Sequence, residues 1–285
     1  SDVHIAFEAT GHYSLNLELY LIDQGYSFMK MNPLVIHQFL KAQSLRRTKT
    51  DKADSLTIAS YLMSVPYKPN SDLLYHIFTL KSLCRSREQL IKERSKFELL
   101  LTNELDKSFP EIKPFFNNTI STTLLCILNK YKNTYHISLM KDFDSLKRIS
   151  HGSFTYAKFA KLKQLAKDSI GYHDENTDLL ISTYVSIINN FNDKIDPINK
   201  QISTIIKDLN PRMLSIPGLG EISAAIILSE YGDIKNFSSS GKMLAFAGLK
   251  PSVIQSGTLE YNGKMVKHGS GHLRYTIMNI AMTIL

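Results

Sequence analysis

The chain has 285 residues, of which 43% are hydrophobic; this is enough for one large domain or two ordinary ones and excludes a chain that is disordered by composition. Lys and Arg outnumber Asp and Glu by 34 to 26, and the net charge of +8 favours a polyanionic partner such as nucleic acid. The two cysteines, Cys84 and Cys126, lack metal-ligand spacing, and the sequence has neither a secretory signal nor the run of roughly 18 apolar residues that a membrane span needs, so we expect a reduced, cytoplasmic protein with no membrane partner.

Residues 1–70 have the pattern of an α/β domain. Short apolar runs of strand length alternate with segments whose apolar residues fall on one helical face, and glycine or proline separates them. This order is typical of βαβ units in a partly parallel sheet. In chain order, the pattern predicts a strand over 3–7, a helix over 12–23, a strand over 27–31, a helix after Asn32-Pro33 and a helix from about Asp51.

Residues 71–209 are predicted to be helical. Apolar residues spaced by alternating threes and fours predict one long helix over 73–107 and another over 178–209, with a kink at Pro197. Such seams indicate an antiparallel coiled coil, within the chain or between chains, or the core of an ordinary helical bundle. Arg87 and Arg94 interrupt the first seam and would face either acids of the partner helix or a phosphate. Between these helices, residues 110–172 predict a small helical cluster for which the sequence suggests no function.

Residues 210–285 begin with a predicted helix-hairpin-helix over 211–237. A Pro-Gly-x-Gly turn that contains Gly218 and Gly220 precedes a helix of small residues. Glycines permit close approach, and the free N–H groups at the start of the next helix can bind a phosphate oxygen. Such a motif contacts the DNA backbone rather than its sequence. A purely structural helix turn is the alternative, and a nucleotide-binding loop is less favoured because no strand precedes it.

Ser256 precedes a glycine in the same region, and a serine on such a loop can approach a phosphodiester without steric hindrance. Lys264, Lys267 and Arg274 follow it and would neutralise the charge of a pentacovalent phosphorane. On local chemistry alone, an ordinary surface turn beside basic residues is the more common explanation.

Three carboxylates form a candidate metal site near the start of the chain. Glu8 ends an apolar strand, and Asp51 and Asp54 are three residues apart on a predicted helix, so they share one face. Carboxylates that converge from a strand and a helix are what an RNase-H-like site uses to hold two magnesium ions on a scissile phosphate. The alternatives are a capping role for Asp51 next to Thr50 and a solvated first-turn acid at Asp54.

Two stretches of the chain are locally basic. Residues 30–52 contain six Lys or Arg against one acid, and residues 241–275 contain five against one. Both are therefore candidate phosphate-facing stretches. The residues expected to contact nucleic acid are Lys49, Gly218, Gly220, Lys264, Lys267 and Arg274.

The order of these motifs resembles one family. The chain is similar to the DEDD transposases of the one-ten insertion-sequence family, a group that includes the Piv and MooV invertases. Several motifs in the right order are far more specific than any one of them. The motifs are Glu8-Ala9-Thr10-Gly11-His12-Tyr13, Asn32-Pro33, Lys49-Thr50-Asp51-Lys52-Ala53-Asp54, Ile216-Pro217-Gly218-Leu219-Gly220, Ala247-Gly248-Leu249-Lys250-Pro251, Gln255-Ser256-Gly257-Thr258 and Gly271-His272-Leu273-Arg274.

The resemblance implies a fold that is α/β plus mainly α. Residues 1–70 would be a partial RNase-H/RuvC-like domain with Mg²⁺ on Glu8, Asp51 and Asp54. Residues 71–209 would be a helical coiled-coil region. Residues 210–285 would be a mostly helical transposase domain, incomplete at its C-terminus, with a helix-hairpin-helix and with Ser256 as the nucleophile of a covalent phosphoserine–DNA link.

The resemblance also implies partners. The protein would act on the DNA of element ends and targets in a bacterial or archaeal cytoplasm, as a homodimer or homotetramer guided by a bridge RNA. The family's first aspartate lies on an earlier strand, for which Asp2 is not a replacement, so we expect this chain to be a fragment that is inactive by itself. The alternatives are a RuvC-like, metal-dependent junction nuclease that needs no serine, and a non-catalytic module that binds nucleic acid.

Overall fold

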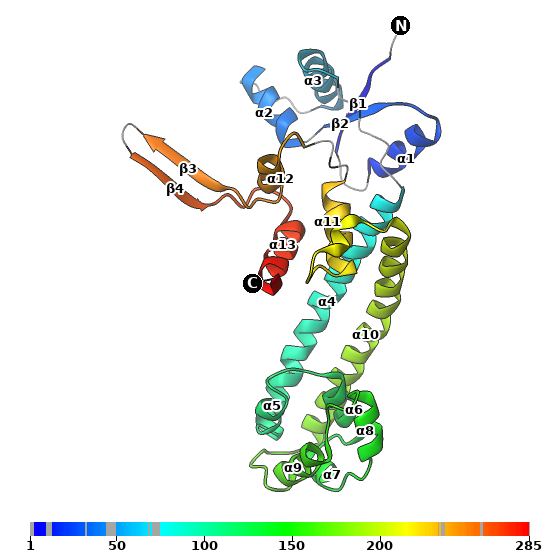
Figure 1. Ribbon diagram of the computed structural model, residues 1–285, viewed down its shortest axis with the longest axis vertical. Coiled ribbons are helices and arrows are strands. Elements are labelled where there is room, and N and C mark those ends of the chain that lie inside the picture. The colour runs from blue at the N-terminus through cyan, green and yellow to red at the C-terminus, as the bar shows by residue number, and fades with distance from the viewer. Residues whose placement is uncertain are drawn as a thin grey trace. The chain divides into compact units, whose positions relative to one another are not determined.

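A computed structural model describes the backbone of residues 3–9, 13–31, 33–43, 50–67, 69, 75–232, 234, 237–256 and 259–284. The chain divides into two compact units: Ser1–Phe78 with Tyr231–Ser238, and Thr79–Glu230 with Ser239–Leu285. The described residues are mostly helical, with two small sheets of two strands each (Figure 1). None of the described helices combines the length and the apolar character that crossing a membrane requires.

The first unit contains a parallel strand pair. Strand β1, Ile5–Glu8, pairs with β2, Phe28–Met31, and helix α1, Leu15–Asp23, connects them (Figure 1). The predicted βαβ arrangement is therefore confirmed. Two strands do not identify an RNase-H-like sheet, so that part of the expected fold remains a prediction.

Two further helices complete the described part of this unit. Helix α2, Pro33–Gln43, begins at a proline, whose missing N–H is not needed in a first helical turn. Helix α3, Asp51–Ser64, begins after Thr50, whose side chain accepts a hydrogen bond of 3.2 Å from the backbone N–H of Ala53. Helix α3 packs against both α2 and β1.

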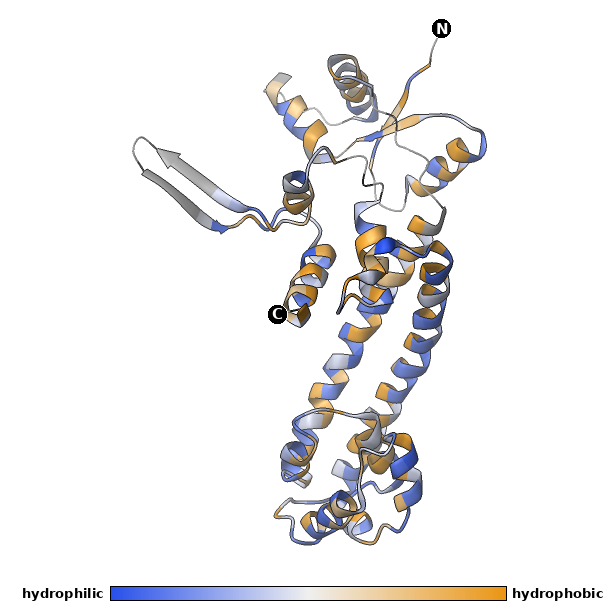
Figure 2. Cartoon of the chain, in the orientation of Figure 1, coloured by the Kyte–Doolittle hydropathy of each residue, from blue (hydrophilic) through white to orange (hydrophobic). Residues whose placement is uncertain are grey.

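The two predicted long helices are α4, Tyr75–Ser108, and α10, Glu175–Leu209, and they pair antiparallel within the second unit (Figure 1). The ring of Phe97 lies 6.4 Å from that of Tyr184 and 5.9 Å from that of Phe191. Hydrophobic and hydrophilic residues alternate along both helices (Figure 2). The predicted coiled-coil pairing could form within the chain or between chains, and in this structure α4 and α10 pair within the chain. Helix α10 continues through Pro197.

Arg87 and Arg94 face α10, but their partners there are amides. Arg87 Nε donates to Asn199 Oδ1 over 2.6 Å, and Arg94 Nη1 donates to Asn192 Oδ1 over 2.7 Å. The prediction of partner acids on the opposite helix is therefore wrong. An asparagine oxygen satisfies the donor without supplying the negative charge that a buried carboxylate would bring.

A lobe of five short helices joins the far ends of α4 and α10, as predicted for residues 110–172 (Figure 1). Its core contains fully buried side chains from the lobe and from both long helices, among them Leu105, Leu128 and Ile181. Side-chain oxygens of Ser121 and Thr155 cap two of the helices. The helices are α5, Ile112–Phe115; α6, Thr122–Lys130; α7, Thr134–Ser138; α8, Phe143–Ile149; and α9, Tyr156–Lys167.

The last part of the chain packs on the opposite ends of α4 and α10. A second core there joins Leu80 and Ile202 of the long helices to Ala224 and Ala225. The elements are a 3₁₀ turn η1, Arg212–Ser215; α11, Glu221–Tyr231; α12, Ser240–Phe246; β3, Pro251–Ser256; β4, Leu259–Met265; and α13, Gly271–Ile284.

Strands β3 and β4 form an antiparallel hairpin that the sequence did not predict. We expected this region to be mostly helical, with Ser256 on a loop. Instead, the backbone of Ser256 ends β3 and pairs with Leu259. The alternation of apolar and polar residues in β3 is too short to stand out among the neighbouring glycines.

Candidate functional site

The three predicted metal carboxylates all lie in the first unit. Glu8 is the last residue of β1, Asp51 is the first residue of α3, and Asp54 lies one turn further along α3. Asp51 is exposed, whereas Glu8 and Asp54 are half-buried. Thr50 caps the helix, so neither aspartate is needed for that role. The described residues provide no hydrogen bond or ion pair to any of the three carboxylates.

These carboxylates have the right chemistry for a divalent cation, because hard cations take oxygen ligands. The packing of α3 against β1 brings their elements together. Nevertheless, within the described parts of the chain no three His, Cys, Asp or Glu side chains are close enough to hold a metal ion. The structure thus places the three acids on neighbouring elements but does not gather them into a metal site. Lys49, predicted to contact nucleic acid next to them, lies outside the described residues.

The predicted helix-hairpin-helix consists of η1, a turn at Pro217–Gly220 and α11. Gly218 has φ +82°, and a Cβ added there would lie 3.3 Å from Ile284 Cγ1. Gly218 and Gly220 are both exposed, as a backbone-reading turn requires. Only the first helix differs from the expected motif, because it is a single 3₁₀ turn.

Glu221, the first residue of α11, would repel a phosphate at this turn if its carboxylate were free. It is engaged instead with α10: it accepts a hydrogen bond of 2.5 Å from Ser203 and lies 3.7 Å from Lys207. These contacts hold the carboxylate against the neighbouring helix, so the exposed turn itself can present its N–H groups.

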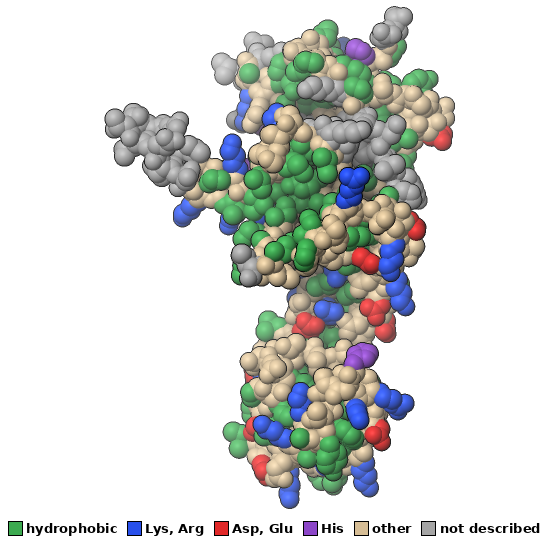
Figure 3. All heavy atoms as spheres, viewed as in Figure 1, with side chains coloured by type: hydrophobic (Ala, Val, Ile, Leu, Met, Phe, Trp, Pro, Cys, Tyr) green, Lys and Arg blue, Asp and Glu red, His purple; other side chains and the backbone are tan. Residues whose placement is uncertain are grey.

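The β3–β4 hairpin has cations at its base, at the end away from Ser256. Lys264 and Lys267 are exposed, and Ser252 donates to the backbone oxygen of Lys264 over 3.1 Å. In the segment 239–284, every charged side chain that the structure describes is a cation. Lys and Arg side chains are visible beside the hairpin in Figure 3. This surface favours an anionic ligand.

Arg274, the third predicted cation, is held by the protein itself. Its Nη1 donates to the backbone oxygens of Ala247 over 3.3 Å and of Lys267 over 3.4 Å. These bonds join the loop before β3 to the loop after β4. The structure therefore gives Arg274 a positioning contact, and its phosphate contact remains a prediction.

Two acids that the sequence analysis missed fix the start of α13. Glu230 is buried and accepts from Arg85 Nε over 3.0 Å and from Ser270 Oγ over 2.9 Å. Ser270 Oγ in turn accepts from the backbone N–H of Leu273 and caps α13. The sequence signal was an acid at the end of the apolar run of α11, because such an acid is seldom buried without a partner.

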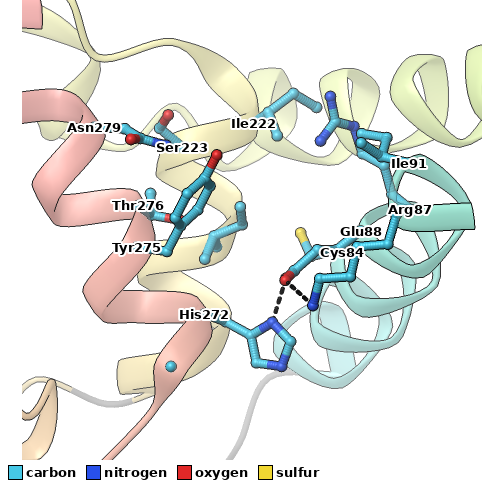
Figure 4. Close-up of a pocket in the computed structure, with 13 residues that line it drawn as sticks. Cys84, Arg87, Glu88, Ile91, Ile222, Ser223, His272, Tyr275, Thr276 and Asn279 are labelled. Atoms are coloured by element: carbon cyan, nitrogen blue, oxygen red, sulfur yellow. Dashed lines mark hydrogen bonds and ion pairs between the residues drawn. The ribbon is translucent and has the colours of Figure 1, made fainter. Parts of the chain in front are cut away.

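Glu88 is the second of these acids, and it borders a cavity of about 710 Å³ between α4, α11 and α13 (Figure 4). It accepts from Lys92 over 2.8 Å and pairs with His272 Nδ1. Burial acts to raise the pKa of Glu88, but the hydrogen bonds from Lys92 and His272 outweigh it and lower the pKa. Burial raises the pKa of Cys84, in the same cavity, to about 12, so this thiol is neutral and not a nucleophile at neutral pH.

Two family models match the chain. A DEDD transposase model of the IS110 group matches residues 1–110, and the model described as transposase IS116/IS110/IS902 family matches residues 210–285. The first segment contains Glu8, Asp51 and Asp54, and the second contains Ser256.

Similar curated proteins agree with these models. The pilin gene-inverting protein of Moraxella bovis is 26% identical over 270 residues, which are 90% of this chain and 59% of that protein. The transposase for insertion sequence element IS1111A of Coxiella burnetii is 28% identical over 123 residues, 42% of this chain and 34% of that protein. The transposase for IS1328 of Yersinia enterocolitica is 30% identical over 91 residues, 31% of this chain and 27% of that protein. The matched residues thus cover less than two thirds of the length of each of these relatives.

Proposed function

We propose that this chain belongs to the IS116/IS110/IS902 family of transposases and is part of a recombinase that cuts and rejoins DNA with a serine nucleophile and a metal-bound carboxylate set. The observation that carries this proposal is the order of the two matched segments. The first supplies three carboxylates that have no partner among the described residues, and the second supplies a serine at the end of strand β3, whose opposite end lies beside exposed lysines. The domain limits 1–70, 71–209 and 210–285 belong to the same proposal.

Glu8, Asp51 and Asp54 would hold Mg²⁺, and the ion would supply positive charge to the scissile phosphate. Two properties of these residues support this role. In the part of this unit that the structure describes, their carboxylates accept no hydrogen bond, so they need not give up such a partner to bind a cation. In addition, α3 packs on β1, which carries Glu8. Since the three carboxylates do not converge in this structure of the described residues, metal binding would require both a further ligand and a movement of their side chains toward one point.

Ser256 would act by transesterification. Its Oγ attacks the phosphorus, the Oγ–P bond forms, and the P–O bond to the leaving strand breaks. The serine loses its proton and the leaving oxygen gains one, so the step consumes neither water nor a redox partner. Lys264 lies beside Ser252, four residues before Ser256 and thus about 13 Å along the strand, so Lys264 and Lys267 would contact DNA phosphates that flank the reacting one. A second strand's hydroxyl then reverses the reaction and rejoins the DNA.

Several nucleic-acid contacts and partners follow from the proposal. The exposed turn at Gly218 and Gly220 would bind a DNA phosphate, and Lys49 and Arg274 would add positive charge near the two halves of the site. A bridge RNA would select the target, and a homodimer or homotetramer would assemble the active sites, so that a serine from one copy meets carboxylates from another.

The experiment uses the protein expressed from its complete reading frame, with labelled DNA that carries the element ends. With Mg²⁺ we expect strand exchange and a labelled protein–DNA adduct that survives a denaturing gel, and chelation by EDTA should remove both. Cleavage that depends on Mg²⁺ but leaves no adduct would instead identify a junction nuclease. Salt-sensitive binding with neither cleavage nor adduct would identify a binding module.

A further inference from the structure

The lobe of helices α5–α9 carries most of the chain's excess charge. Residues 111–172 contain ten Lys or Arg against four Asp or Glu, a net charge of +6 out of +8 for the whole chain. This segment lies between the two matched segments, 1–110 and 210–285. Its charge is therefore not explained by the carboxylates, the hairpin or the helix-hairpin-helix.

Most of these cations are exposed and have no carboxylate partner. In the part of the chain that the structure describes, none of six exposed lysines of the lobe forms an ion pair: Lys132, Lys141, Lys147, Lys158, Lys161 and Lys167. The lysines of α4 differ, because Lys92, Lys96 and Lys107 each lie within 2.9 Å of a glutamate one turn earlier. Unpaired like charges repel one another, so a bound polyanion would stabilise the lobe surface.

Helix α9 presents part of this surface. Phe159, Leu162 and Ala166 face the core, so Lys161 points away from it, and Lys158 and Lys167 lie on the two flanks of the helix. All three lysines are exposed, and Lys158 Nζ donates to the backbone oxygen of Ser153 over 3.0 Å. At a rise of about 1.5 Å per residue, Lys158 and Lys167 are separated by about 13 Å along the helix. A duplex presents a phosphate roughly every 3.4 Å along each strand, so three exposed lysines spread around the outer side of α9 can contact several phosphates of a duplex.

Exposed tyrosines accompany the lysines. Tyr135 is 69% exposed, Tyr156 is 67% exposed and Tyr172 is 71% exposed, although tyrosine is a residue that usually buries much of its ring. Phenolic hydroxyls donate to phosphate and sugar oxygens. Lys and Arg side chains are also spread over the visible face of the lobe in Figure 3.

We propose that the α5–α9 lobe is a second nucleic-acid-binding surface, which contacts the phosphate backbone of a duplex through Lys158, Lys161 and Lys167 on α9. It reads no sequence, because backbone contacts carry none. DNA and RNA duplexes present the same phosphodiester chemistry, and the experiment distinguishes them. The surface does not depend on Ser256 or on a metal, so binding is measured in EDTA, and its failure would leave the serine mechanism untouched.

The test compares two triple variants of this chain that lose the same charge. In the first, Lys158, Lys161 and Lys167 are changed to Gln. In the second, the control, Lys92, Lys96 and Lys107 of α4 are changed to Gln. Fluorescence anisotropy with short DNA and RNA duplexes over a series of NaCl concentrations gives Kd and its salt dependence. Far-UV circular dichroism checks that both variants keep their helices.

We expect the α9 variant to bind at least one duplex about tenfold or more weakly than the control variant, with a log–log salt slope that is smaller by about 2 to 3, since each lost phosphate contact removes about 0.9. A larger loss with RNA would identify an RNA duplex as the ligand, and a larger loss with DNA would identify DNA. Binding of both duplexes within twofold of the control variant, with an unchanged slope, would overturn the proposal.

Discussion

Ser256→Ala is expected to abolish the protein–DNA adduct and to lower the rate of strand exchange by at least about 10⁴-fold, as loss of a nucleophile does elsewhere. Alanine removes the oxygen that forms the bond to phosphorus and leaves no group that can replace it. DNA binding should stay within a few-fold, because the basic residues at the base of the hairpin are unchanged. A strand-exchange assay and a denaturing gel, both with the protein from the complete reading frame, measure these effects.

Ser252→Ala is the matched control for this variant. Ser252 lies on the same strand, and its hydroxyl donates to the backbone oxygen of Lys264 over 3.1 Å. The substitution removes one hydroxyl and one hydrogen bond from the hairpin, at a cost of about 1 kcal/mol. We expect adduct formation within a few-fold of the parent. Equal loss in both variants would mean that the hairpin's stability, and not the chemistry of Ser256, limits the reaction.

Gly269→Ala is expected to be strongly destabilising, with a loss of about 3 kcal/mol in the free energy of unfolding. Gly269 has φ +141°, and an added Cβ would lie 2.2 Å from the backbone oxygen of Phe246 and 2.9 Å from the backbone nitrogen of Gly248. A side chain in an unfavourable backbone region costs roughly 1–3 kcal/mol, and overpacking adds about 1–3. Because the clash is with backbone, the loops on both sides of the hairpin must move.

Gly152→Ala provides the comparison for Gly269. Gly152 also has a positive φ, +85°, but an added Cβ would meet no atom within 4 Å. An alanine there would be destabilised only by the left-handed backbone conformation, which costs about 1–2 kcal/mol. Urea unfolding followed by far-UV circular dichroism measures both variants. A loss for Gly269→Ala no larger than for Gly152→Ala would show that the contact with α12 is not tight in solution.

The helices of this chain were predictable because their signals are local. Pro33 marks the start of α2, Thr50 caps α3, and the heptads of α4 and α10 extend over many turns. The order of β1, α1 and β2 also followed from apolar runs that glycine separates. In contrast, the hairpin of β3 and β4 lies among glycines, and its strands lack a long alternating pattern.

Long-range polar contacts were not predictable. The seam position of Arg87 was clear from the heptad, but only the pairing of the helices shows that Asn199 is its partner. Similarly, the residues around Glu230 in the sequence do not indicate that it joins Arg85 of α4 to Ser270 at the start of α13. Each contact depends on which helices meet and in which register. The roles of Ser256 and of the three carboxylates likewise came from motif order and remain predictions.

The most direct test of the serine mechanism is to identify the residue that carries the DNA. The adduct formed by the protein from the complete reading frame would be digested with protease and nuclease, and the modified peptide sequenced by mass spectrometry. The mechanism predicts a nucleotide linked to the side-chain oxygen of Ser256. A nucleotide on any other residue, or strand exchange without a modified peptide, would contradict it.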